Sequence, residues 1–585
     1  MAEKRVDPLD GQSYSYQELL AYYKGKFKKS QIQLYWNEVC YVQAAGKKPK
    51  AKGKAKAKAK AATKAKEDGP TSSTMTKAAE DLVKVMAKRD KDWRVGCVVY
   101  QVFVDRFAPP ADLQAKKELF PAPCTLHEWS ENPTRGLQNK ETGYWEHELQ
   151  FWGGDLPSLL GKFDYLKDLS IDVLYLQPIC KAFSNHKYDA TDYNELEPQY
   201  GTSDDFQALV KALHAEDMKL VLDGVFNHMG KRNEAVQEAL KDKESKKRDW
   251  FYFGDEYPQG FKTWGGADSL VELRLETKPL MNYIKYVVAS WLGGGADGWR
   301  LDVAQELGFR HLQTITDAAH RAKKSSLVVG EVWAYPSRWM DCMDGVLNLH
   351  LGVVIYGVVS GDFAGPAAAE AVGDLVEDSC IEDVLKSWIV VSNHDMPRLG
   401  SKVEGDADRN LVQILQFTLP GCPLIYYGDE IGMVGGDDPD NRAPFTWEKV
   451  SEGNSALSHT KTCIKLRKSL RGLRIGDYRA LRAGRLMAFM RTTDRVQDTV
   501  VVLVNGSSAD VKETVVVPDT RILGYTLFKD ELSGEEIRIL GGTVNCEVKA
   551  KSARVFAMVN ESENPSGAQY KRVFGHWATF KGIKP

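Results

Sequence analysis

The segment Gly295–Val303 places an arginine and an aspartate two residues apart at the end of a short apolar run. Side chains two apart on a strand point to the same face, so Arg300 and Asp302 are expected to emerge together. A neighbouring cation favours the ionised form of a carboxyl, and a covalent nucleophile must be ionised and oriented. The sequence therefore predicts a reactive carboxylate at this strand end.

Two more acidic residues end apolar runs further along the chain. Glu331 closes the run LVVGE, and Asp395 closes WIVVSNHD. A single carboxylate at a strand end is commonplace, but three on separate strands are typical of glycosidic-bond chemistry, which uses paired carboxyl groups. The sequence therefore predicts a site that is built from several strands.

The elements that position these residues alternate from about residue 91 onward. Eight buried strands that alternate with helices predict an α/β fold, a (β/α)8 TIM barrel over residues 73–477, with catalytic residues at the carboxyl ends of its strands. The predicted strands are 98–104, 173–177, 220–225, 298–303, 327–331, 345–349, 388–392 and 423–427. The predicted helices include 155–169, 203–217, 278–293, 305–323 and 408–418.

Other segments complete the predicted domain organisation. The longest break, after the third strand, predicts an inserted subdomain at about 229–275 that lines a cleft. Residues 478–563 are rich in short strands and turns, which predicts a C-terminal all-β sandwich followed by a tail at 564–585. Residues 1–45 have amphipathic spacing and predict a small helical segment, and residues 46–72 predict a Lys/Ala-rich linker.

Charge is distributed unevenly along the chain. The net charge is −2, and residues 47–66 hold ten lysines and no acidic residue, so the remainder carries about −12. A mildly acidic body with one basic tract does not indicate a nucleic-acid enzyme. The lysine-rich tract is interpreted as a solubilising spacer, and contact with an anionic partner is the alternative.

Cysteine content and hydropathy limit the class of protein. The nine cysteines are scattered, odd in number and include no Cys-x-x-Cys pair, which argues against a disulfide framework or structural zinc. No apolar run approaches the ~20 residues that a membrane helix needs, so no membrane span is expected. The first residues lack the hydrophobic stretch of a secretory signal. We therefore expect a cytoplasmic protein.

The motifs at the strand ends resemble those of glycoside hydrolase family 13, the α-amylase family. YQVFVDRF, SNHKYDATDY, DGVFNH, GWRLD, GEVW, NHD and YYGDEIGM occur in the family's order. SNHKYDATDYNELEPQYG and GMVGGDDPDNRAPFTW are most similar to the neopullulanase, cyclomaltodextrinase and maltogenic amylase branch. The resemblance implies a retaining enzyme that cleaves α-1,4-glucosidic bonds of maltooligosaccharides, cyclodextrins or starch through a glycosyl-aspartate intermediate.

The resemblance also implies a role for each candidate residue. Asp302 matches the nucleophile, Glu331 the general acid/base, and Asp395 the third carboxylate, which binds hydroxyls of the distorted sugar. Retaining chemistry requires the first two carboxyls about 5–5.5 Å apart. The substrate-binding residues are expected to be Tyr188, His228, Arg300, His394, Asp438 and Arg442, with Tyr188 stacking on the sugar. The residues expected behind them are Asp223, which positions Arg300, and Asn227 and Glu306.

The sequence differs from this branch at several places, and these differences limit the properties that the resemblance implies. The branch often has an Asn/Asp-rich calcium loop after the first strand, whereas Ala108–Leu113 reads APPADL and is poor in oxygen ligands. Asn227 matches a family calcium ligand without identifiable partners, so we expect no required cofactor and no metal site. The branch's β-rich N-terminal domain is replaced by the lysine-rich extension. Gln305 and Glu306 resemble the Asn-Glu of the cyclomaltodextrinase branch and are expected to face the acceptor side.

Two alternative functions stay open beside hydrolysis. A transglycosidase would use the same site and differ only in whether water or a sugar hydroxyl resolves the intermediate. A non-catalytic carbohydrate-binding scaffold could share the fold, since fold alone does not determine function. Such scaffolds usually lose a carboxylate, and all three are present here.

Overall fold

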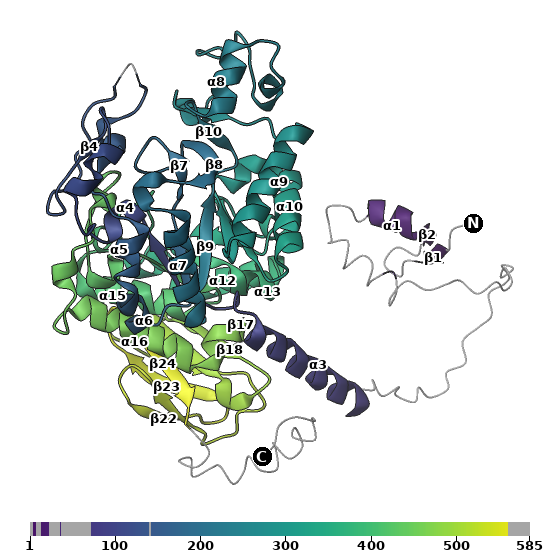
Figure 1. Ribbon diagram of the computed structural model, residues 1–585. Helices are drawn as coiled ribbons and strands as arrows, with labels where there is room; N and C mark the ends of the chain where they lie inside the picture. Colours follow the sequence, from purple (N-terminus) through teal and green to yellow (C-terminus); the bar gives the residue numbers. More distant parts are fainter. Residues whose placement is uncertain (1–3, 7–12, 23–35, 37–71, 140–141, 560–585) are drawn as a thin grey trace, which may run out of the picture. The chain divides into compact units, whose positions relative to one another are not determined.

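The computed structural model describes residues 4–6, 13–22, 36, 72–139 and 142–559 (Figure 1). The chain divides into two units, Met1–Ser72 and Ser73–Pro585. In the first unit, β1 (Lys4–Val6) pairs antiparallel with β2 (Ser13–Ser15), and α1 (Tyr16–Tyr22) follows. The segment at 1–45, predicted to be helical, therefore begins with a strand pair. The Lys/Ala-rich tract of the predicted linker lies outside the described residues.

Eight parallel strands of the second unit close into a barrel, which confirms the predicted (β/α)8 fold. Each of the eight predicted strands contributes one barrel strand. In chain order they are β3 (Val99–Val102), β6 (Val173–Leu176), β9 (Lys219–Gly224), β12 (Gly298–Leu301), β13 (Leu327–Val332), β14 (Gly345–Asn348), β15 (Trp388–Ile389) and β16 (Cys422–Tyr426), which pairs with β3.

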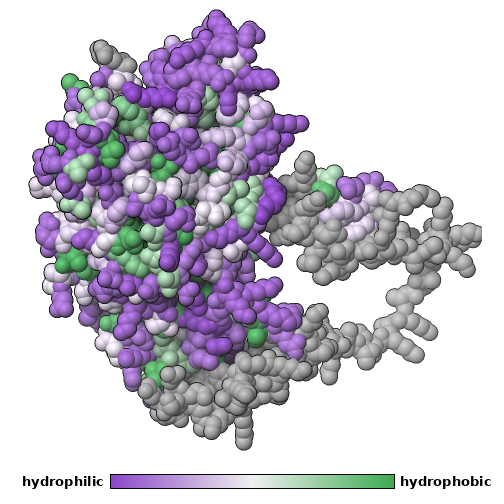
Figure 2. Space-filling model, viewed as in Figure 1, coloured by the Kyte–Doolittle hydropathy of each residue, from purple (hydrophilic) through white to green (hydrophobic). Residues whose placement is uncertain are grey.

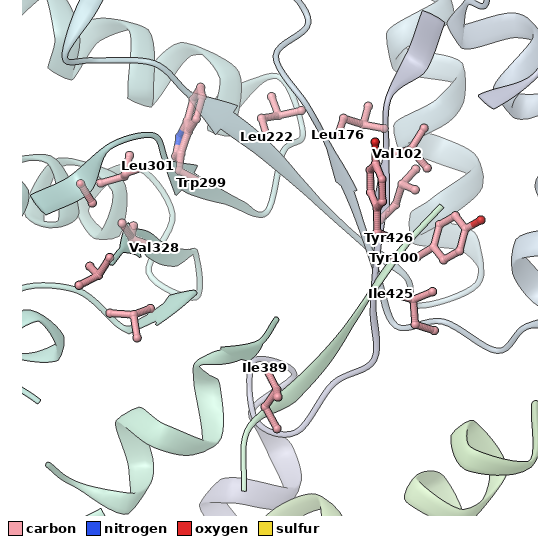
Figure 3. Packing of buried hydrophobic residues seen from close by; sticks show 14 of the residues in the cluster. Tyr100, Val102, Leu176, Leu222, Trp299, Leu301, Val328, Ile389, Ile425 and Tyr426 are labelled. Carbon is pink, nitrogen blue, oxygen red and sulfur yellow. The ribbon is translucent and has the colours of Figure 1, made fainter. Parts of the chain in front are cut away.

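Successive strand residues belong to two different hydrophobic clusters. One cluster consists mainly of strand side chains such as Val99, Val221 and Val329, which fill the barrel interior. The other joins the intervening strand residues to the surrounding helices, and Figure 3 shows part of it, including Trp299 and Leu301 of β12. Because side chains alternate along a strand, the side chain between Trp299 and Leu301 points into the barrel.

Helices cover the outside of the barrel (Figure 1). The predicted helix at 155–169 is two short helices, α5 (Leu156–Leu160) and α6 (Phe163–Asp168), because Gly161 caps the first. The other predicted helices are α7 (Ser203–Ala215), α9 (Lys278–Gly293), α10 (Ala304–Ala322) and α15 (Gly405–Thr418). Further helices are α4 (Val104–Phe107), α11 (Leu349–Ser360), α12 (Gly365–Asp378), α13 (Ile381–Lys386), α14 (Leu399–Lys402), α16 (Ser455–Ser469) and α17 (Arg471–Ile475).

Two inserted segments follow the carboxyl ends of barrel strands and line the candidate site that is described below. After β6, the strands β7 (Cys180–Ala182) and β8 (Ala190–Leu196) pair antiparallel. After β9, the predicted insertion consists of β10 (His228–Gly230) paired with β11 (Leu270–Glu272) and of α8 (Glu234–Lys241), which projects from one end of the barrel in Figure 1. A shorter pair, β4 (Thr125–Leu126) and β5 (Gln150–Phe151), lies in the segment between β3 and β6.

A helix that the sequence pattern did not predict precedes the barrel. It is α3 (Ser72–Lys91), and its Arg89 side chain is buried. Arg89 Nη2 donates to Glu382 at 2.9 and 3.0 Å, and Nη1 donates to Asp477 at 2.8 Å and to the Ile475 carbonyl at 2.9 Å. These charge-assisted bonds anchor the end of α3 to the barrel domain.

The C-terminal strands form two sheets around a separate core. The larger sheet has the order β17 (Asp477–Ala480), β18 (Met487–Thr492), β19 (Val500–Asn505), β24 (Ser552–Met558), β21 (Leu527–Asp530), β22 (Glu536–Arg538). The smaller pairs β20 (Val511–Val516) with β23 (Thr543–Val548). The other face of the larger sheet packs on the barrel helices through Met487, Phe489 and Val502. Strands β17 and β23 were not predicted.

On the face of the molecule that Figure 2 shows, the described residues are mostly hydrophilic. Hydrophobic residues occur on this face in small, separate patches. Within the described ranges, no helix has both the length and the apolar content needed to cross a bilayer.

Candidate active site

Arg300, which points into the barrel from β12, contacts two of the predicted catalytic carboxyls. Its Nη1 donates to Asp302 Oδ1 at 2.8 Å, and its Nη2 lies 2.9 Å from Glu331 Oε2 on the neighbouring strand β13. All three side chains are buried. Because the guanidinium is planar and its donors have fixed directions, it fixes the positions of Asp302 and Glu331 relative to each other.

Asp223 supports Arg300 from the adjacent strand β9. The parallel register places the two residues opposite each other, and Arg300 Nη1 donates to Asp223 Oδ1 at 2.9 Å. The hydroxyls of Tyr175 and Tyr188 donate to Asp223 Oδ2 at 2.5 and 3.0 Å. Asp223 and Arg300 therefore form a buried ion pair behind the carboxyls that line the pocket.

Asp395, in the loop that follows β15, belongs to a second charged cluster. Arg442 lies between two carboxylates, with Nη2 3.6 Å from Asp395 Oδ1 and Nη1 3.2 Å from Asp438 Oδ1. His394 Nε2 lies 3.2 Å from Asp395 Oδ2. Arg442 thus joins Asp395 and Asp438 on one side of the site, as Arg300 joins Asp302 and Glu331 on the other.

Tyr188 connects the two clusters. Its hydroxyl contacts Asp223 and also lies 2.6 Å from His394 Nε2. The Tyr188 and His394 rings stack with centroids 5.4 Å apart and 4° between their planes. Gln101 lies 3.0 Å from the other ring nitrogen of His394 and fixes the ring further. A flat aromatic surface of this kind suits the C–H face of a sugar.

His228 presents unpaired polar atoms to the site. Its ring stacks on Trp264 with centroids 5.1 Å apart, and neither ring nitrogen has a hydrogen-bond partner among the described residues. Burial lowers the pKa of His228 to about 3, so the ring is neutral and offers one donor and one acceptor. Buried polar atoms without partners are costly, so these nitrogens are suited to hydroxyls of a ligand.

Most of the predicted site residues line a single pocket of about 420 Å³. Those that line it are Tyr188, His228, Asp302, Glu331, His394, Asp395, Asp438 and Arg442. Arg300 and Asp223 lie behind it. Asn227 and Glu306 are not part of the lining: Asn227 is buried and its carbonyl accepts from Leu273, whereas Glu306 is exposed in the first turn of α10.

The structure adds lining residues that the sequence did not single out. They are Glu148, His186, Trp264, Ala267, Leu270, Val303 and Trp333. His186 and Trp333 stand inside the motifs SNHKYDATDY and GEVW, so those motifs could have indicated them. Glu148, which lies 3.4 Å from His186, belongs to the 3-10 helix Glu146–Leu149 before β5 and carries no comparable signal.

Glu331 is held by donors at both oxygens. The Trp333 indole donates to Oε1 at 3.0 Å, and the backbone N–H of Val303 donates to Oε2 at 2.9 Å. Val303 adopts a φ of 41°, which is strained for a β-branched residue. The strained turn directly after Asp302 thus aims a backbone donor at the neighbouring carboxyl.

The charges around Arg300 shift the protonation equilibria of the site. Burial raises the pKa of Asp302 well above its usual range, the carboxylates of Glu331 and Asp223 add to this, and Arg300 opposes it. Burial also raises the pKa of Asp395, and it lowers the pKa of His394 well below its usual range. Carboxyls that interact this closely titrate as a group, so the cluster can hold a proton while one member stays ionised.

The residues around the loop 108–113 do not fit a calcium ion. Ca²⁺ takes 6–8 oxygen ligands. The oxygens that converge beside this loop belong to Gly153, Asp155 and Gln199, and they accept hydrogen bonds from the Lys116 ammonium. In the described part of the chain, no group of three or more His, Cys, Asp or Glu side chains could hold a metal ion. We therefore derive no chemical step through a metal.

Comparison with known families identifies the barrel. The model of the alpha amylase catalytic domain matches residues 101–477, the interval that contains every residue of the pocket. The chain belongs to the α-amylase family. This α-amylase family protein is therefore a glycosidase, and the sequence resemblance is confirmed.

Similar proteins of this α-amylase family come from the branch that the motifs indicated. The chain is 32% identical over 473 residues to neopullulanase 2 of Thermoactinomyces vulgaris, which covers 76% of this chain and 75% of that protein. It is 31% identical over 439 residues to the cyclomaltodextrinase of Geobacillus thermopakistaniensis (strain MAS1), covering 73% and 69%.

Solved structures agree with this assignment. The cyclic α-maltosyl-(1→6)-maltose hydrolase from Arthrobacter globiformis in complex with maltose has a TM-score of 0.67 at 26% identity, covering 80% of this chain and 100% of that chain. The type III pullulan hydrolase from Thermococcus kodakarensis has a TM-score of 0.68 at 26% identity, covering 80% and 82%.

Proposed function

We propose that this glycosidase is a retaining α-glucan hydrolase that cleaves α-1,4-glucosidic bonds of maltooligosaccharides, cyclodextrins or starch fragments. The observation that carries the proposal is the shared contact of Asp302 and Glu331 with Arg300, in one pocket with Asp395. The names of the relatives, neopullulanase and cyclomaltodextrinase, support the substrate class.

The first chemical step assigns different roles to the two carboxyls on Arg300. Glu331 donates its proton to the glycosidic oxygen while the Asp302 carboxylate attacks the anomeric carbon. The bond to the leaving sugar breaks, and an ester between the sugar and Asp302 forms. Arg300 orients the nucleophile, and the N–H groups of Val303 and Trp333 orient the acid.

The second step releases the product. The ionised Glu331 takes a proton from a water molecule, which attacks the same carbon and frees the Asp302 carboxylate. Throughout, Tyr188 supplies the stacking surface, and His228, His394, Asp395 and Arg442 supply partners for the sugar hydroxyls. Both histidines have lowered pKa values and stay neutral at pH 7, so they bind hydroxyls and add no cationic charge.

Incubation with β-cyclodextrin, pullulan, maltotriose and soluble starch tests the proposal. We expect shorter α-glucans from at least one substrate, and a loss of about 10³-fold or more in kcat for Asp302→Asn, since an amide does not form the ester. Mass spectrometry after trapping with a fluorinated sugar is expected to find the label on Asp302. Normal turnover by Asp302→Asn would refute the assigned nucleophile, and inactivity of the wild type on every α-glucan would favour the binding scaffold.

The same incubation separates hydrolysis from transfer. Hydrolysis of maltotriose gives only shorter products, whereas a transglycosidase also gives products longer than maltotriose. We expect shorter products to dominate, and dominance of longer ones would assign the protein as a glucanotransferase.

For location and partner, we propose a cytoplasmic enzyme whose lysine-rich tract, residues 47–66, binds an anionic surface. A relative named intracellular maltogenic amylase from Bacillus subtilis, 29% identical over 386 residues and covering 64% of this chain, supports the location. Electrostatic binding weakens with ionic strength. We therefore expect the full chain to bind anionic vesicles at low salt and to release them at high salt, and a chain lacking residues 47–66 not to bind.

A further inference from the structure

The side-chain ammonium of Lys116, in the 3-10 helix Gln114–Leu119, is surrounded by three oxygen atoms, which we call the cage. Its ammonium donates to the Gly153 carbonyl at 2.7 Å, to Asp155 Oδ2 at 2.8 Å and to the Gln199 carbonyl at 2.8 Å. The side chain is only 12% exposed, although both neighbours, Ala115 and Lys117, are exposed. An ammonium has three N–H donors, so three acceptors satisfy it completely.

The ammonium and its three acceptor oxygens come from three separate segments. Lys116 follows the first barrel strand, Gly153 and Asp155 precede α5, and Gln199 belongs to the 3-10 helix Pro198–Tyr200 after β8. The segments meet closely: Gly153 has a φ of +76°, and a Cβ there would lie 2.9 Å from Leu113 Cδ1. One cation therefore joins loops that belong to different βα units.

The charge of the cage matches a monovalent cation. Among the described residues, Asp155 is the one carboxylate in contact with the Lys116 ammonium. Glu197, two residues before Gln199, is paired with Lys187 at 3.0 Å. Joining loops through carbonyl and carboxylate oxygens is the task that bound Ca²⁺ performs in many proteins, but Ca²⁺ takes more oxygens and more negative charge than this cage supplies.

We propose that the Lys116 ammonium is a built-in cation, which takes the place of a structural metal ion in joining the loop after the first strand to the wall of the active-site pocket. The connection to the pocket is short. Gln199, whose carbonyl accepts from Lys116, also accepts at its side-chain Oε1 from Lys187 Nζ at 2.6 Å. Lys187 is fully buried and directly precedes Tyr188, whose ring stacks on His394 in the pocket.

Metal content and thermal stability of the full chain test the proposal. We expect inductively coupled plasma mass spectrometry to find no stoichiometric calcium in the purified wild type. We also expect its Tm to be the same in EDTA and in millimolar CaCl₂. Stoichiometric calcium, or a fall in Tm on chelation, would overturn the proposal without any variant being made.

Variants at neighbouring lysines test the role of the ammonium. Lys116→Met keeps the length of the side chain and removes its charge, so we expect a fall in Tm of roughly 3–5 °C. The matched control Lys117→Met, at an exposed position, is expected to leave Tm unchanged. Equal Tm values for the two variants would contradict the proposal.

A third variant tests whether the oxygens of the cage can bind a metal cation when the lysine is removed. Lys116→Ala vacates a position whose charge matches a monovalent cation, so we expect KCl to raise the Tm of Lys116→Ala by more than it raises the Tm of Lys117→Ala or of the wild type. Equal responses of all three proteins to KCl would show that the oxygens accept only the lysine, and would overturn the claim that it replaces a metal ion. Activity need not be measured for any of these outcomes.

Discussion

At the scale of single residues, Arg300 organises the site. It is fully buried and contacts Asp223, Asp302 and Glu331. A buried cation is costly unless its charge is neutralised, and here the neutralising carboxylates include two that perform the proposed chemistry. Arg300 thus stabilises the carboxylates of Asp302 and Glu331, and their charge stabilises the buried Arg300 in turn.

The leaving group distinguishes the role of Glu331. In Glu331→Gln the proton donor is lost, so we expect kcat/KM on maltooligosaccharides to fall by about 10²–10⁴-fold. Substrates with an activated leaving group, such as nitrophenyl maltosides, need little protonation and are expected to lose far less. Equal losses for both kinds of substrate would place the acid on another residue.

Asp302 is expected to cost stability at neutral pH. Its folded pKa lies above the unfolded value near 3.9, so the native state binds more protons than the unfolded state between the two values. The stability contributed by that proton is therefore present below pH ~3.9 and is lost as pH rises through the folded pKa.

Asp302→Asn removes this titration. We expect the variant to have a higher Tm than the wild type at pH 7, and the difference to shrink toward pH 4. Thermal unfolding between pH 4 and pH 8 measures this, with Asp374→Asn at an exposed position as the control. A difference that grows toward low pH would show that the buried carboxyl stabilises the native state in its ionised form.

At the scale of elements, the alternation along β12 decides which residues meet. Trp299 and Leu301 pack against the helices, so Arg300 points inward, and the strained turn at Val303 then directs a backbone donor toward Glu331. The segments after β6 and β9 contribute Tyr188 and His228 to the lining of the same pocket. The proposed catalytic residues therefore lie at or after the ends of barrel strands, and the proposed stacking surfaces come from the segments inserted between strands.

The helix α3 is expected to matter for stability and not for catalysis. All pocket residues lie between Glu148 and Arg442, so deletion of residues 1–71 should leave kcat on maltotriose within about twofold of the wild type. Deletion of residues 1–91 also removes the bonds of Arg89 to Glu382 and Asp477, and we expect it to lower Tm by roughly 3–5 °C. A large loss of kcat in the shorter deletion would mean that the extension reaches the pocket.

At the scale of the whole molecule, one face of the larger C-terminal sheet packs into the hydrophobic cluster of the barrel helices. Met487, Phe489 and Val502 belong to the same hydrophobic cluster as the barrel helices. Arg491 of β18 donates to the Thr418 carbonyl at the end of α15 at 2.9 Å. The barrel and the sandwich are thus joined by apolar burial and by buried hydrogen bonds.

A chain that ends at residue 476 is expected not to fold as a stable barrel. Its truncation exposes the apolar faces of α12 and α15 that the larger sheet covers, and burial contributes roughly 25 cal/mol per Å². We expect this chain to aggregate or to bind a hydrophobic dye, whereas a chain that ends at residue 559 is expected to unfold like the full chain. A soluble, active barrel without the sandwich would contradict this account.

The alternation of apolar runs and helical spacing in the sequence was sufficient to predict the barrel, because buried parallel strands are short and apolar and are flanked by helices. It missed α3, whose first residues are polar, and it merged α5 with α6, because a single glycine cap is a weak signal in an apolar run. Motifs were sufficient to identify Asp302, Glu331 and Asp395 as pocket residues: Asp302 and Glu331 lie at the ends of β12 and β13, and Asp395 stands in the motif NHD in the loop after β15. Glu148, in the 3-10 helix Glu146–Leu149, had no such signal. Trp264 belongs to the insertion at 229–275, which was predicted to line a cleft, although no single residue of it was named as a site residue.

The sequence by itself determined the fold class, the family and the identity of the acidic residues at the strand ends, because these are properties of local spacing. Only the tertiary structure decided that one guanidinium joins Asp302 to Glu331, that Arg442 joins Asp395 to Asp438, and that Lys116 ends among the oxygens of two distant segments. Such contacts depend on barrel closure and on strand register, which are set by the packing of the whole chain and by no local pattern.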